Sequence, residues 1–204
     1  MHLFQFDKYH IFLKLFKFFF LLFVLQKDIV FSNEKTGAEK VNFLTANPFS
    51  FFHIITDLEN QESQNAYGIL SFPESIIRNK YPLILGVNGS KNWADHHLEY
   101  MEMYRKMGFA TFEIQSFKSR HVNSTVGDQT TVTIAMMILD SYRALEVLGK
   151  DKRIDIDNVA ITGWSLGGGV ALFSAWEPLI ASIGTKERFK AHLAFYPPCL
   201  VEMD

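Results

Sequence analysis

The sequence predicts an α/β protein with a mostly parallel sheet and helices on both of its faces. Short apolar runs alternate along the chain with longer segments of helical periodicity, which is the pattern of consecutive β-α units. The pentapeptide Gly163-Trp164-Ser165-Leu166-Gly167 also stands between an apolar run and a helix-forming run, so a tight turn is expected to join a buried strand to a helix there. The 204 residues suffice for one domain with a sizeable core.

The first part of this domain is expected to supply three strands after a linker. Residues 33–50 are polar and contain Gly37 and Pro48, which predicts a linker, and the folded domain is expected to cover 51–204. The predicted strands are residues 51–55, their hairpin-like partner 66–72, and 82–88. The third is a continuous apolar run, which is typical of a strand buried on both faces of a parallel sheet.

The second part of the domain shows the alternation most clearly. Helices are expected over residues 95–107 and 130–148, and Gly108 and Gly149 end them. A long polar loop, 115–128, precedes the second helix and is expected to lie over the site. The remaining elements are the strand 109–114, the strand 158–162 before the turn, a helix after it, and the strand 191–196.

The N-terminus differs in composition from the rest of the chain. Nine of the 20 Phe fall within residues 1–31, and three lysines lead into eight uncharged apolar residues, 18–25. A membrane-spanning helix needs about 20 apolar residues, whereas a positive lead and a short apolar run are typical of a secretory signal peptide. Residues 1–32 are therefore expected to direct a periplasmic or secreted protein. The alternative is an uncleaved segment that anchors the protein to the membrane.

Composition excludes several other classes of function. The net charge is −2, and no basic stripe with interleaved aromatic residues is present, so nucleic acid is not an expected partner. The single cysteine, Cys199, allows no intrachain disulfide. His96 and His97 are adjacent, diverge on a helix and make a poor ligand pair, so no metal is expected. They are expected to be surface or loop residues.

The turn at residues 163–167 carries the functional signal. A G-x-S-x-G sequence between a strand and a helix is the nucleophile elbow of serine hydrolases, in which the turn lifts the serine hydroxyl above the sheet edge. Such a serine needs a histidine to accept its proton, a carboxylate to orient that histidine, and two backbone N–H groups for the oxyanion. The donors are expected from Leu166, which follows the serine, and from Ser90 in the loop after the strand 82–88.

The chain resembles the α/β-hydrolase fold and, within it, the dienelactone hydrolase family. The resemblance covers about Tyr81 to Cys199 and is carried by the elbow together with the segments 83–90, 125–129, 153–155 and 195–199. It implies a Ser–His–Asp hydrolase of a carboxylic ester or lactone, with no metal or organic cofactor. It also implies Ser165 as the nucleophile, with Leu166 and Ser90 as oxyanion donors.

The sequence departs from this family in two places. Relatives often carry His before the glycine of the first oxyanion loop, where this chain has Asn88. In this fold the acid and the histidine follow the serine. The only histidine after Ser165 is His192, which begins a predicted strand although catalytic groups gather at the carboxyl ends of parallel strands. Glu202 or Asp204 could supply a carboxylate near the site, but a solvated tail is the favoured interpretation. We therefore expect an incomplete domain that lacks the last strands, with its acid and base beyond residue 204. An inactive domain that binds a ligand or partner is the alternative.

Four further residues are expected to contact the substrate. Arg120 lies in the long loop and has the guanidinium geometry that pairs with a carboxylate. The other three flank the elbow in the predicted fold and are Asn88, Trp164 and Tyr196, of which Trp164 and Tyr196 either line the pocket or pack beneath it. The strand 191–196 leaves a hydrophobic sheet edge, which is expected to allow association between chains.

Overall fold

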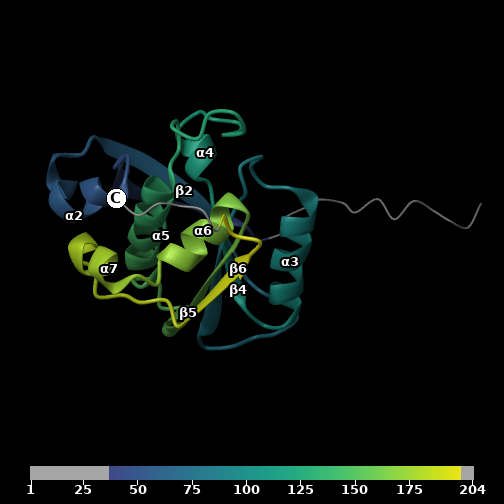
Figure 1. Ribbon diagram of the computed structural model, residues 1–204. Helices are drawn as coiled ribbons and strands as arrows, with labels where there is room; N and C mark the ends of the chain where they lie inside the picture. Colours follow the sequence, from purple (N-terminus) through teal and green to yellow (C-terminus); the bar gives the residue numbers. More distant parts are fainter. Residues whose placement is uncertain (1–36, 199–204) are drawn as a thin grey trace, which may run out of the picture. The chain divides into compact units, whose positions relative to one another are not determined.

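The computed structural model describes residues 37–198 (Figure 1). The predicted signal peptide, residues 1–32, lies outside the described residues, and so do Cys199, Glu202 and Asp204. The described part includes the predicted elbow and the segments on either side of it.

Six strands form one mixed sheet in the order β1-β2-β4-β3-β5-β6. Strands β4, β3, β5 and β6 run parallel to one another, whereas β1 pairs with β2, and β2 with β4, in the antiparallel sense. The mostly parallel sheet predicted from the sequence is thus confirmed, with an antiparallel pair at one side. The bounds are β1 Glu39–Ala46, β2 Ser63–Ser71, β3 Tyr81–Val87, β4 Ala110–Ile114, β5 Ile154–Trp164 and β6 Ala191–Phe195.

Helices cover both faces of this sheet, as predicted (Figure 1). Helix α3 packs on one face, against β3 and β4, and α5 and α6 pack on the other. None of the helices within residues 37–198 is by itself long and apolar enough to cross a membrane, although α6 and α7, bent by 85°, pass that test together. The helices are α2 Phe51–Thr56, the 3-10 turn η1 Leu58–Asn60, α3 Asp95–Lys106, α4 Ser116–Ser119, α5 Ile134–Leu148, α6 Leu166–Phe173 and α7 Glu177–Ile183.

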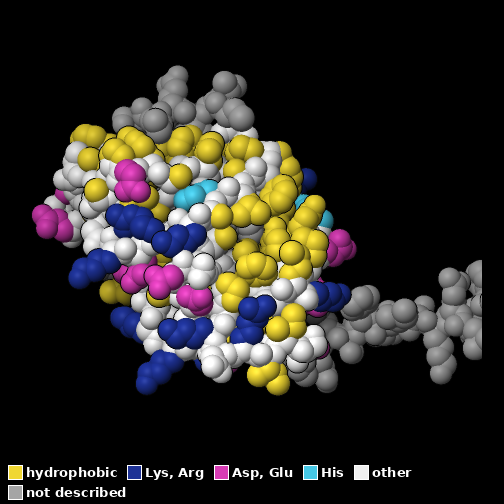
Figure 2. All heavy atoms as spheres, turned by 90° about the horizontal axis from the view of Figure 1, so that it is seen from below, with side chains coloured by type: hydrophobic (Ala, Val, Ile, Leu, Met, Phe, Trp, Pro, Cys, Tyr) yellow, Lys and Arg dark blue, Asp and Glu magenta, His cyan; other side chains and the backbone are white. Residues whose placement is uncertain are grey.

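Alternation along β5 divides its side chains between two apolar cores. Val159 and Ile161 point into the main cluster, which they share with α5 and α6. Trp164 belongs to a second cluster on the α3 face, together with Met101 and Tyr104 of that helix. Because the two clusters lie on opposite faces of the sheet, both faces of the central strands are buried, which explains their continuous apolar sequence. Figure 2, the view from below, shows that hydrophobic side chains also gather on the surface of the molecule.

Two predictions about the start of the domain are wrong. Glu39–Ala46, placed in the linker 33–50, forms strand β1, in which Phe43 and Thr45 are buried beside exposed neighbours. Residues 51–55, predicted as a strand, lie in helix α2, which buries Phe51 and Ile54 at helical spacing. A short apolar run does not distinguish a strand from a buried helix, because both bury such residues. The hairpin-like partner of β2 is consequently β1.

A buried ion pair ties the start of the domain to α5. Both nitrogens at the tip of the Arg120 guanidinium donate to the Asp140 carboxylate, at 2.7 and 3.0 Å, and the two side chains are 6% and 0% exposed. Arg120 also donates to the Ala46 and Ser116 carbonyls and to the Asn47 side chain. A guanidinium has five N–H groups, and these five bonds use all of them. Arg120 therefore links β1, α4 and α5.

We expect Arg120→Ala to lower the free energy of unfolding by about 3–5 kcal/mol, because it leaves the Asp140 carboxylate buried without its partner. Arg143→Ala is the control, since Arg143 pairs with Glu146 in a half-exposed position on α5. Its cost is expected to be about 0–1 kcal/mol. Urea denaturation followed by circular dichroism measures both changes. Equal, small losses in the two variants would contradict a structural role for Arg120.

Candidate active site

Ser165 adopts the backbone conformation expected of a nucleophile elbow. It stands between the end of β5 and the start of α6, with φ 53° and ψ −115°. A positive φ is costly for a residue with a side chain, and such residues persist where the surroundings enforce them. Here the Ser165 N–H donates to the Phe195 carbonyl at 3.0 Å, and the Ser165 carbonyl accepts the Gly169 N–H at 3.1 Å. The chain thus holds the serine in a strained turn at the carboxyl edge of the sheet.

The glycines of the motif are required by close packing around this turn. A Cβ added at Gly163 would overlap the Gly167 carbonyl, and one at Gly167 would overlap the Val87 carbonyl. At Gly168 it would lie 2.6 Å from the Phe195 carbonyl oxygen. Backbone atoms cannot move aside as a flexible side chain can, so only glycine fits at these positions.

The loop after β3 lies against Ser165. A Cβ built on Gly89 would be 3.6 Å from the Cβ of Ser165. Within the described residues the Ser90 N–H donates to no acceptor. Leu166 begins α6, so its N–H has no acceptor within the helix either. The two predicted oxyanion donors therefore come from segments that flank Ser165.

The long loop after β4 forms hydrogen bonds with the loop that carries Gly89 and Ser90. The Thr125 N–H donates to the Ser90 carbonyl at 2.9 Å, and the Ser124 hydroxyl donates to the same oxygen at 3.0 Å. The segment 115–128, expected to lie over the site, therefore contacts the loop that carries Ser90.

Trp164 packs beneath the site. Its side chain is 1% exposed and lies in an aromatic stack between the rings of His97, at 4.6 Å, and Phe195, at 5.8 Å. Successive strand residues point to opposite faces, so the residue before Ser165 faces the α3 side of the sheet. Of the two positions expected for Trp164, packing beneath the pocket is the one observed, and its ring does not contact a substrate.

The side chains of Arg120 and Asn88 also form hydrogen bonds within the protein and are not available to a substrate. Arg120 was expected to bind a substrate carboxylate, but Asp140 and three other acceptors occupy its donors. The prediction for Arg120 is therefore wrong. The loop sequence alone does not show that Arg120 pairs with a buried carboxylate 20 residues later in the chain. Asn88 is fully buried, and its side-chain amide donates to the Gly89 carbonyl at 3.0 Å. It contacts the oxyanion loop and has no exposed surface for a substrate.

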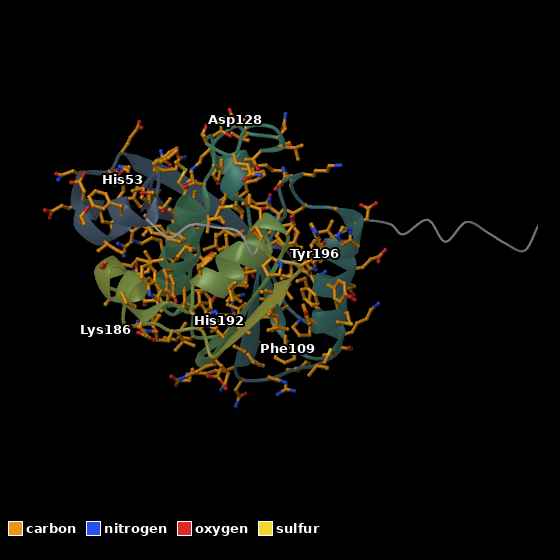
Figure 3. All side chains as sticks on the ribbon, in the orientation of Figure 1. His53, Phe109, Asp128, Lys186, His192 and Tyr196 are labelled. Atoms are coloured by element: carbon orange, nitrogen blue, oxygen red, sulfur yellow. The ribbon has the colours of Figure 1, made fainter. Side chains whose placement is uncertain are left out.

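Tyr196 lies where the sequence placed it, beside the elbow. It follows β6 directly, with φ 38°, and its side chain is 62% exposed. The hydroxyl group lies 3.3 Å from Nε2 of His96 (Figure 3 labels Tyr196). Its role in substrate binding stays a prediction, and the structure adds His96 as its neighbour.

The prediction that His97 is a surface or loop residue is wrong, because it lies on the buried face of α3, and sequence reasoning missed its place beside the elbow. It is 4% exposed, and its Nδ1 accepts the Ala94 N–H at 3.2 Å. Burial, followed by the adjacent His96, lowers the pKa of His97 to about 4, so the ring is neutral at pH 7. The signal was its spacing, since His97, Met101 and Tyr104 are the buried residues of α3 and follow the period of a helix.

His192 is remote from the serine, as predicted. It pairs with Ile161 in the register of β5 and β6, four residues before Ser165, or about 13 Å along a strand. Its Nδ1 contacts the Ser174 hydroxyl and the Ala171 carbonyl, and Figure 3 places it and Tyr196 at opposite ends of β6. His97 lies near the serine, but its Nδ1 accepts the Ala94 N–H, so the neutral ring carries its proton on Nε2 and has no free nitrogen to accept the Ser165 proton. Among residues 37–198 no cluster of three metal-binding side chains occurs.

A hollow of about 420 Å³ lies at the opposite end of the strands. Arg78, Lys80 and Lys190 contribute to its wall. Open α/β sheets bind ligands at the carboxyl ends of their parallel strands, whereas this hollow lies beside the start of β3. The candidate site is therefore the edge that carries Ser165.

The structure is similar to that of a Klebsiella pneumoniae protein described as a dienelactone hydrolase, with a TM-score of 0.52 and 16% identity over 80% of this chain and 62% of that one. The chain has the α/β-hydrolase fold. Two other structures are less similar. An acetyl xylan esterase from Paenibacillus sp. R4 has a TM-score of 0.45 and 15% identity over 73% of this chain and 47% of that one. The dienelactone hydrolase-like phosphotriesterase P91 from metagenomic libraries has a TM-score of 0.43 and 16% identity over 68% of this chain and 54% of that one. Neither a protein-family model nor a curated protein matches the sequence.

The likeness confirms the fold predicted from the sequence. This chain spans 62% of the length of the Klebsiella protein. At 16% identity the likeness extends to the fold alone, and the chemistry depends on the residues of the site.

The lowered pKa of His97 predicts a pH-dependent stability. In the unfolded chain its pKa returns to 6.5, so the unfolded chain binds more protons than the folded chain between about pH 6.5 and 4. The contribution of His97 is therefore complete above pH 6.5 and is lost as the pH falls towards 4, at up to about 1.4 kcal/mol per pH unit.

His97→Asn keeps an acceptor for the Ala94 N–H and removes the titrating group. We expect the free energy of unfolding of the unmodified protein to fall relative to that of this variant between pH 6.5 and 4.5. Urea denaturation at several pH values measures the difference. A difference independent of pH would show that the pKa of His97 is not lowered.

Proposed function

We propose that the protein is a serine hydrolase that cleaves a carboxylic ester or lactone through an acyl-enzyme on Ser165, in the manner of dienelactone hydrolases. The observation that carries this proposal is the strained conformation of Ser165, with φ 53°, between β5 and α6. A domain that only binds a ligand has no need of such strain at a serine. Strained residues cluster at functional sites.

Each described group then has a role in the reaction. The Ser165 hydroxyl attacks the ester carbonyl, and the N–H groups of Leu166 and Ser90 stabilise the resulting oxyanion. Collapse of this intermediate breaks the bond to the alkoxy oxygen, which receives the proton that the base took from Ser165, and leaves the acyl-enzyme. An ester releases its alcohol at this step, whereas the new hydroxyl group of an opened lactone stays on the acyl chain. Water then hydrolyses the acyl-enzyme. The proposed reaction needs a histidine base and an orienting carboxylate besides the groups described within residues 37–198. No metal or organic cofactor is part of the proposed chemistry.

Fluorophosphonate labelling tests the nucleophile directly. The protein expressed from its complete reading frame is expected to form a covalent adduct that tandem mass spectrometry assigns to Ser165. Ser165→Ala should abolish the adduct and lower the hydrolysis of small esters by at least about 10³-fold, because the attacking oxygen is lost. Ser182→Ala, on α7, is the matched control and should leave both unchanged. An adduct that survives in Ser165→Ala would refute the assignment.

The alternative is a hydrolase-like domain that binds a ligand or partner without turnover. One observation favours it: Nδ1 of His97 accepts the Ala94 N–H, so its Nε2 carries the proton, and His192 pairs with Ile161, remote from Ser165. The labelling experiment separates the two functions, since a serine without a base reacts with the fluorophosphonate no faster than an ordinary surface serine.

We also propose that the protein is periplasmic or secreted, with membrane anchoring as the alternative. The proposal is based on the lysines and the short apolar run of residues 1–32. N-terminal sequencing of the protein from the cells that make it is expected to begin shortly after residue 32. Recovery of residue 1 in a membrane fraction that resists carbonate extraction would favour the anchor. An intact N-terminus on cytoplasmic protein would contradict export.

A further inference from the structure

The Asn88 side chain is a donor aimed at its own loop. It is fully buried, its Nδ2 donates to the Gly89 carbonyl at 3.0 Å, and within the described residues its Oδ1 has no hydrogen-bond partner. Turning the amide over would place Oδ1 against the Gly89 oxygen and leave Nδ2 with no acceptor. Two oxygens cannot form a hydrogen bond to each other without a proton, so the observed orientation is the favourable one.

Holding the Gly89 carbonyl also fixes the direction of the Ser90 N–H. The two groups belong to one planar peptide unit, and in the trans form they point in opposite directions. Two donors hold this carbonyl, Nδ2 of Asn88 at 3.0 Å and the Asn92 N–H at 2.9 Å. Asn92 has φ 69°, in the left-handed region that asparagine tolerates, and this conformation belongs to the turn that brings its N–H back to Gly89. The peptide therefore cannot rotate without losing both bonds.

The next peptide is held in the same way. The Ser90 carbonyl accepts hydrogen bonds from the Thr125 N–H and the Ser124 hydroxyl, while the Ser90 N–H is left without an acceptor in the described part of the chain. Because Gly89 packs against Ser165, this free donor belongs to the loop that borders the nucleophile. Anchored carbonyls on both sides of one free N–H form a preorganised donor, whose orientation costs nothing at the moment of reaction.

We propose that Asn88 is a positioning residue, whose side-chain amide orients the Gly89–Ser90 peptide so that the Ser90 N–H points at the oxyanion formed on Ser165. This inference rests on the proposed function. It assigns Asn88 a role through its loop in place of contact with the substrate. The Asn88 amide thus supplies the second hydrogen bond to the Gly89 carbonyl, beside that of the Asn92 N–H.

The order of the Ser90 amide tests the positioning without any need for activity. Nitrogen-15 relaxation on the ¹⁵N-labelled full protein gives an order parameter, which is about 0.85 for a rigid backbone. We expect Asn88→Ala to lower that of Ser90 below about 0.6, the range of flexible backbone. Asn88→Leu keeps the approximate size of the side chain and has no donor, so it should act alike and carries the test if Asn88→Ala does not fold. Asn158→Ala, on the exposed start of β5, is the control and should change nothing.

The rate of fluorophosphonate labelling tests the catalytic consequence. Asn88→Ala is expected to lower the maximal rate of Ser165 modification by about 10–100-fold, somewhat less than the loss of a whole oxyanion donor. The concentration for half-maximal rate should stay unchanged, because the oxyanion exists only after attack. Asn158→Ala should leave the rate within about twofold of the unmodified protein.

The two measurements separate the failure of each idea. An unchanged order parameter at Ser90 in both Asn88 variants overturns the positioning role, whether or not Ser165 reacts. A mobile Ser90 with an unchanged labelling rate overturns its link to the oxyanion. A mobile Ser90 in a protein whose Ser165 never reacts supports the positioning of this peptide and refutes the hydrolase function.

Discussion

The site depends on close backbone packing where β5 turns into α6, which leaves no room for a side chain at the glycines of this turn. The backbone of Gly167 lies so close to the end of β3 that a single methyl group would collide with the Val87 carbonyl. The end of β6 closes the same junction, since the Phe195 carbonyl accepts the Ser165 N–H at 3.0 Å. Three parallel strands thus meet the start of one helix. The strained backbone of Ser165 is stable only because this packing leaves it no other conformation.

The same edge of the sheet concentrates buried polar atoms that lack protein partners. Within residues 37–198 they include side-chain atoms of Asn88, Gln115, Ser116, Thr125 and Trp164, which follow or lie beside the carboxyl ends of β3, β4 and β5. Each such group costs about 1–3 kcal/mol. The fold tolerates the cost of these unpaired polar groups because the central strands are buried in apolar cores on both faces. Stability gathered in the body of the sheet therefore offsets an unfavourable polar edge, as expected of a site shaped for chemistry.

Charged and titratable groups around this edge serve the architecture. Arg120 crosses from the loop after β4 to Asp140 on α5 and thereby fixes the loop that supports Ser90. His97 stays neutral beneath Trp164 and closes the first turn of α3 through the Ala94 N–H. Neither group faces an open site, so the electrostatics of the described site come mainly from backbone N–H groups. Fixed backbone dipoles suit an oxyanion, because they need no reorganisation as charge develops.

The sequence by itself determined the class of fold, the parallel central strands and the elbow at Ser165. These features depend on local signals: apolar runs, helical period, and glycines that only a crowded turn requires. It predicted the opposite conformation for residues 51–55 and missed β1, because a half-buried edge strand and a short apolar helix have weak patterns. Only the tertiary structure decided what Arg120, Asn88, Trp164 and His97 do. Their roles depend on partners brought together by folding, such as Asp140 for Arg120 and the ring of Trp164 for His97, and no spacing along the chain encodes those contacts.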